Sequence, residues 1–160
     1  MKKIISNIVA VSAMGVSCLS YGGIIFQDEH KQLTVLSMPK VGTKTPDRCE
    51  LIVGDPFLHD ATVIFSKQWN GSTGLGFFVH GTEGDVGMLR YDNKSKPSNF
   101  RTDVMQKQSW FKKDLYSLLS AKTVTVSVSD FETHITITNV IDITQAKEAI
   151  KKFEGCIKIL

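Results

Sequence analysis

The segment Ala61–Tyr91, ATVIFSKQWNGSTGLGFFVHGTEGDVGMLRY, decides the fold of this chain. In its first part, Ala61–Trp69, apolar residues such as Val63 and Phe65 recur at every second position. That period predicts a strand with one buried face. The strand runs into Asn70-Gly71, a pair that tolerates the positive φ of a tight hairpin turn.

Two more strands are expected along the segment, at Gly74–His80 and Asp85–Tyr91, with a second turn at Gly81–Gly84 between them. Together the three strands predict an antiparallel meander in the middle of the chain. The glycines near the first turn lie between two strands, whereas a phosphate-binding loop leads from a strand into a helix. We therefore interpret them as turn and bulge residues. These glycines are Gly71, Gly74 and Gly76.

Strands are also expected on both sides of this meander. Gln32–Met38 and Cys49–Val53 precede it and are separated by a turn-rich connection. Two half-buried strands joined at Asp130–Glu132 follow it, because their apolar residues alternate with Thr and Ser. The alternating apolar residues are Val124, Val126, Val128, Ile135 and Ile137.

Two helices complete the predicted fold. Ser109 is expected to cap a short middle helix that ends near Ala121. Asp142, with Gln145 three residues further on, has the spacing of a capping box for a final helix that Gly155 ends. The chain is thus predicted to be α+β, a single β-rich domain of about seven mostly antiparallel strands with two helices. The apolar stripe of the final helix consists of Ala146, Ala149, Ile150 and Phe153.

Residues 1–20 have the order of regions found in a secretory signal peptide. Lys2 and Lys3 precede the apolar stretch Ile4–Val16, and small residues follow it. We expect cleavage between residues 17 and 22, which would leave 21–160 as a mature domain in the periplasm or outside the cell. The apolar stretch is shorter than the roughly 20 residues of a membrane span. Lipidation at Cys18 is the alternative, and it would anchor the protein to a membrane.

Cys49 and Cys156 are the two cysteines that remain after such cleavage. An even pair in an oxidising compartment predicts a disulfide, which would tie the final helix to the N-terminal third of the chain. A redox role is disfavoured, because the sequence has no C-x-x-C motif and neither cysteine has a histidine beside it.

Charge and motifs argue against several functional classes. The formal net charge is +3, and without Lys2 and Lys3 the chain has 17 basic and 16 acidic residues. This balance gives little support to nucleic-acid binding. The sequence has no G-x-S-x-G or H-E-x-x-H motif, so no metal or cofactor is predicted. The histidines His30, His59, His80 and His134 are scattered, and His59-Asp60 is interpreted as loop surface.

Aromatic residues of the predicted meander suggest a surface for a partner. Phe77 and Phe78 are adjacent in one strand, so their rings point to opposite faces of the sheet. One of them is therefore available to solvent, a helix or a partner, with Trp69 and Tyr91 as the other members of the predicted partner surface. Burial in the core is the alternative for each of these rings.

Several short stretches also match a known order of features. They are Leu33-Thr34-Val35, Cys49-Glu50-Leu51, Ala61–Phe65, Leu115–Ala121 with Thr123-Val124-Thr125-Val126, and Ile135–Val140. In this order the chain resembles the invasion-associated locus B family of small exported bacterial proteins. The resemblance implies a periplasmic or surface-associated β-rich domain linked to host interaction, with no known reaction. The additional cysteines usual in that family are missing around Ser109–Lys113.

These observations favour an exported, non-enzymatic protein-binding module of the bacterial envelope. Its partner would be another envelope or secreted protein, and an inhibitor or immunity protein is one subclass. Two alternatives remain open at this point. One is an accessory component of a secretion or conjugation apparatus, and the other is an envelope hydrolase that uses His59, Asp60 or His134.

Overall fold

A computed structural model describes residues 23–40, 42–43, 45–55, 60–79, 82–92, 98–101 and 108–160. The predicted signal peptide and Cys18 lie outside these described residues. Ten strands and two helices are present in the described part. In chain order they are β1 (Gly23–Gln27), β2 (Leu33–Pro39), β3 (Pro46–Val53), β4 (Ala61–Gln68), β5 (Thr73–Val79), β6 (Thr82–Glu83), β7 (Val86–Tyr91), β8 (Ser98–Arg101), α1 (Gln108–Ser120), β9 (Thr123–Asp130), β10 (Ile135–Asp142) and α2 (Ala146–Ile157).

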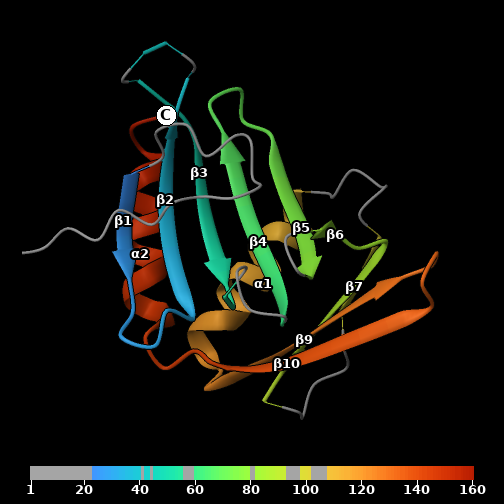
Figure 1. The fold of residues 1–160 in the computed structure, drawn as a ribbon. Helices are drawn as coiled ribbons and strands as arrows, with labels where there is room; N and C mark the ends of the chain where they lie inside the picture. The colour runs from blue at the N-terminus through green and yellow to red at the C-terminus, as the bar shows by residue number, and fades with distance from the viewer. Residues whose placement is uncertain are drawn as a thin grey trace, which may run out of the picture.

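The larger sheet contains six antiparallel strands in the order β1-β2-β3-β4-β5-β6. Alternation along each strand sends one set of side chains to the core, and the register aligns Val35, Leu51, Phe65 and Leu75 across four strands. Both helices lie on one side of this sheet (Figure 1). They pack on the core face, where Phe111 of α1 contacts Phe65 of β4 edge-on at a ring-centroid distance of 5.8 Å.

The smaller sheet has the order β10-β9-β7-β8, and its strand pairs are antiparallel. The strands β9 and β10 form the hairpin predicted from the alternating Val/Ile and Thr/Ser pattern. The valines of β9 and Ile141 of β10 are buried in the core, and Ile137 packs against it, whereas Ile135 and Val140 of β10 are exposed. The opposite face carries hydroxyl groups that hydrogen-bond across the strands. The Ser127 and Thr138 hydroxyl oxygens are 2.8 Å apart, as are those of Ser129 and Thr136.

The predicted three-stranded meander is wrong in its third strand. The strand β7 pairs with β9 in the smaller sheet, and β5 pairs instead with the two-residue strand β6. The chain changes sheets at two consecutive residues: the Gly84 N–H donates to Phe77 O, and the Asp85 N–H donates to Ser129 O. Close approach makes the glycine necessary, because a Cβ on Gly84 would lie 2.3 Å from Val128 Cγ1.

Both helix boundaries predicted from capping residues need correction. Ser109 lies inside α1, which begins at Gln108. Asp142 ends β10, and its carboxylate accepts a hydrogen bond from the Thr144 N–H at 2.8 Å, so it caps a turn ahead of α2. Gly155 does not end α2, because the buried Cys156 that follows it remains in the helix.

The predicted disulfide is present between Cys49 in β3 and Cys156 in α2. The two Cα atoms are 6.0 Å apart, and the cysteines are separated by 107 residues in sequence. The bond fixes α2 to the larger sheet within a buried apolar cluster that draws residues from both sheets and both helices. The α+β class, the antiparallel sheets and the two helices are therefore confirmed, while β1, β6 and β8 are additional strands. Within the described residues, no helix is long and apolar enough to cross a membrane.

Candidate functional site

The predicted partner surface does not form one patch. Phe77 is fully buried against Gly87 of the facing sheet, so the prediction that it contacts a partner is wrong. Phe78 points to the opposite face of β5, where its ring lies over Gly76. Trp69 is 63% exposed in the turn between β4 and β5. Of the three residues, Trp69 is the one most accessible to a partner.

Tyr91 has a structural role between β7 and α1. Its hydroxyl oxygen lies 3.0 Å from the backbone oxygen of Asp114 and 3.2 Å from a carboxylate oxygen of the same residue. Burial raises the pKa of Tyr91 far above its ordinary value, and the charge of Asp114 and their hydrogen bond raise it further. Tyr91 is therefore a neutral hydroxyl that joins the smaller sheet to α1.

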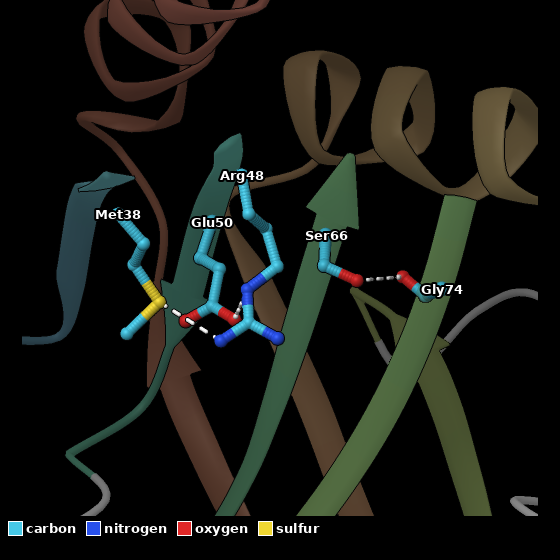
Figure 2. Close-up of polar contacts among 5 residues, drawn as sticks. All are labelled: Met38, Arg48, Glu50, Ser66 and Gly74. Carbon is cyan, nitrogen blue, oxygen red and sulfur yellow. Dashed lines mark hydrogen bonds and ion pairs between the residues drawn. The ribbon is translucent and has the colours of Figure 1, made fainter. Parts of the chain in front are cut away.

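An ion pair occupies the face of the larger sheet that points away from the helices. Figure 2 shows Arg48 and Glu50 of β3 beside Met38 of β2. Arg48 Nε lies 3.0 Å from Glu50 Oε1, and Arg48 Nη2 donates to the Met38 sulfur at 2.9 Å. The side chains of Arg48 and Glu50 are 40% and 11% exposed.

Glu50 is the acidic member of this ion pair. Burial raises the pKa of its carboxyl group, and the positive charge of Arg48 opposes part of that shift. Ser66 on the neighbouring strand is opposite Glu50 but turns its hydroxyl toward the Gly74 carbonyl oxygen, at 3.4 Å (Figure 2). We interpret the Arg48–Glu50 pair as part of the sheet's own packing.

Only part of the set weighed for hydrolysis falls within the described residues. His59 and His80 fall outside the described residues. His134 lies in the turn between β9 and β10 with a φ of 56°, far along the chain from Asp60 at the start of β4. Among the described residues, no group of three or more His, Cys, Asp or Glu side chains is placed to hold a metal ion.

A groove of about 760 Å³ runs along α2 beside the edge strand β1. Its basic side chains are Lys147, Lys151 and Lys152, and Glu148 is its acidic one. Apolar surface comes from Ile25 of β1 and from Ile159 beyond the end of α2, which is 62% exposed. The groove thus combines a net positive charge with exposed aliphatic surface. Thr144, Gln145, Gly155 and Cys156 complete its lining.

The amphipathic pattern of α2 builds one wall of this groove. Its apolar stripe, predicted from the sequence, is buried against the sheet and extends to Cys156. Lys147 and Lys151 are four residues apart and therefore lie next to each other on the exposed side of the helix. The disulfide at Cys156 fixes this wall to β3.

The strand β1 provides the opposite wall and was not predicted. Its pairing with β2 shifts between Ile24 and Phe26, so Ile25 is an extra residue in the ladder and is available to the groove. The signal that could have located the groove is the i, i+4 lysine pair on an otherwise ordinary amphipathic helix.

Comparisons with protein-family models, curated proteins and solved structures find no match for the chain.

Proposed function

We propose that this chain is a protein-binding module of the bacterial envelope, and that its groove between β1 and α2 receives an extended acidic and partly apolar segment of another protein. The observation that carries the proposal is the composition of the groove, in which three lysines and one glutamate surround exposed isoleucines.

Charge complementarity selects the partner chemistry. Lys147, Lys151 and Lys152 outnumber Glu148, so acidic side chains would be attracted to the groove. Ile25 and Ile159 would cover aliphatic side chains of the same segment and remove apolar surface from water. A partner with both acidic and aliphatic side chains is more complementary to the groove than an anion or an apolar ligand alone.

The scaffold around the groove supports a binding role. The helix wall is joined to the central part of the larger sheet by Cys49–Cys156, and its inner face is buried. A site held in this way loses little conformational entropy when a partner binds. An oxidising compartment favours such a disulfide, which agrees with the signal peptide predicted for residues 1–20.

Site-specific photo-crosslinking in the envelope of a producing bacterium tests this proposal. A photoreactive amino acid replaces Lys151 in the groove or, as a matched control, Lys113 on the exposed side of α1. We expect a discrete adduct from position 151 that maps by mass spectrometry to an acidic, aliphatic segment of one protein. No adduct at 151, or the same adducts from both positions, would contradict the proposal.

A further inference from the structure

The edge strands of the two sheets differ in how well they are protected from pairing with another chain. Edges of natural sheets are usually short, bulged or marked by Lys or Pro, which prevents pairing with another chain. The strand β1 contains the bulge at Ile25, β6 has two residues and β8 has four. The strand β10 has eight residues, ITITNVID, and pairs with β9 without a register shift. It contains no Lys, Arg or Pro, so it is the edge most open to pairing in the described part of the chain.

The phase of the hydrogen-bond ladder shows which groups of β10 face outward. The Asp142 N–H donates to the Gln32 side-chain oxygen at 3.0 Å, so it points away from β9. Because backbone groups alternate in an antiparallel ladder, those of Thr136, Thr138 and Val140 also point away from β9. The close hydroxyl contacts of Thr136 and Thr138 with β9 fit this assignment, since side chains approach most closely in pairs without backbone hydrogen bonds.

We infer that two copies of this chain associate by antiparallel pairing of their β10 strands about a twofold axis at Thr138. Thr136 of one copy then lies opposite Val140 of the other, and Thr138 lies opposite itself. The two four-stranded sheets become one continuous sheet. This inference is independent of the proposed groove, which lies on α2 and β1.

The outward-facing groups fix this register. A ladder centred on Thr138 uses Thr136, Thr138 and Val140 of both copies. A shift of the centre to Val140 would require the Asp142 N–H, which Gln32 already engages, and a shift to Thr136 would run beyond the start of β10. Only the register at Thr138 keeps all three outward-facing residues within the strand.

Side-chain chemistry favours a second copy as the occupant. Ile135 and Val140 are 54% and 56% exposed, and pairing would place β-branched side chains opposite one another across the new ladder. Asp142 is the one charged residue of β10, and the twofold axis brings His134 of the other copy to its end of the ladder. The strand is thus complementary to itself in apolar surface and hydroxyl groups.

Analytical ultracentrifugation of the full chain, purified with its disulfide formed, tests the inference over a concentration series. We expect a concentration-dependent dimer for the wild type and for Thr138→Val, which keeps the backbone groups and the branched side chain. Thr138→Lys and Thr138→Glu place like charges at the axis and should each raise the dimer Kd about a hundredfold. Circular dichroism confirms that the variants are folded, since Thr138 is exposed.

Mixing the two charged variants tests the position of the axis. An equimolar mixture of Thr138→Lys and Thr138→Glu should regain dimers, because opposite charges then meet at residue 138. A wild type that is monomeric at every concentration, a Thr138→Lys variant that dimerises like the wild type, or a mixture that stays monomeric would overturn the inference.

Discussion

Gly87 lies where the two sheets approach each other closely. A Cβ at this position would lie 2.0 Å from Phe77 Cγ, in the fully buried part of the core. Gly87→Ala is therefore expected to lower the free energy of unfolding by about 1–3 kcal/mol, the usual cost of overpacking a core.

Urea denaturation measures this effect, with Gly155→Ala as a matched control. A Cβ at Gly155 would meet nothing within 4 Å, and the residue lies in the last turn of α2. This control should raise stability by about 0.5–1 kcal/mol, because alanine is the better helix residue. Equal effects of the two substitutions would contradict the close packing of Phe77 on Gly87.

Glu50 gives the protein a specific pH dependence. Its pKa is raised above 4.5 in the folded state, so the folded protein holds this proton more tightly than the unfolded chain does. Ionisation of Glu50 therefore costs stability as the pH rises through the raised pKa. The difference in unfolding free energy, wild type minus Glu50→Gln, should decrease as the pH rises above about 4.5. Urea denaturation at several pH values measures it, and an increase over this range would contradict the account.

At the scale of elements, the hydrophobic period of the sequence predicted which face of several strands is buried. It did not predict which strands pair with each other. The alternation in Ala61–Trp69 and in the Val/Ile–Thr/Ser hairpin identified β4, β9 and β10, because burial of one face imposes a period of two. The same period in β7 gave no information on its neighbour. Its place in the second sheet depends on Gly84 and Gly87, whose close contacts exist only in the folded chain.

The ends of the helices were predicted less well than their apolar stripes. Asp142 has a capping spacing but belongs to β10, since its backbone continues the ladder opposite Thr123. Gly155 is tolerated inside α2, where the burial of Phe153 and Cys156 sustains the helix on both sides of it. Tertiary contacts override local signals at both positions.

The candidate site could be predicted only in part. The buried stripe of α2 and the disulfide were evident from the sequence, and both support the groove. Ile25 and Ile159 lie at opposite ends of the described chain, and they meet α2 only because β1 occupies the sheet edge. The prediction for Phe77 was wrong for a related reason. Phe77 and Phe78 were correctly assigned to opposite faces, but the sequence did not indicate which face is buried.

At the scale of the whole molecule, the disulfide joins segments that are 107 residues apart. Replacement of both cysteines by alanine should lower the free energy of unfolding by about 2–5 kcal/mol, since the unfolded chain is no longer constrained. Urea denaturation of the double variant measures the loss. Wild-type protein treated with a reductant should show a similar loss, and unchanged stability in both would contradict a structural role for this bond.

The central claim is recognition of an acidic, partly apolar segment by the groove between β1 and α2. Isothermal titration calorimetry with a synthetic peptide of the crosslinked segment tests it most directly. The variant Lys147→Glu/Lys151→Glu should bind at least about tenfold more weakly than the wild type, a change of about 1.4 kcal/mol. The control Lys112→Glu/Lys113→Glu, which makes the same charge change on α1, should bind like the wild type. Equal affinity of the groove variant and the wild type would contradict the claim.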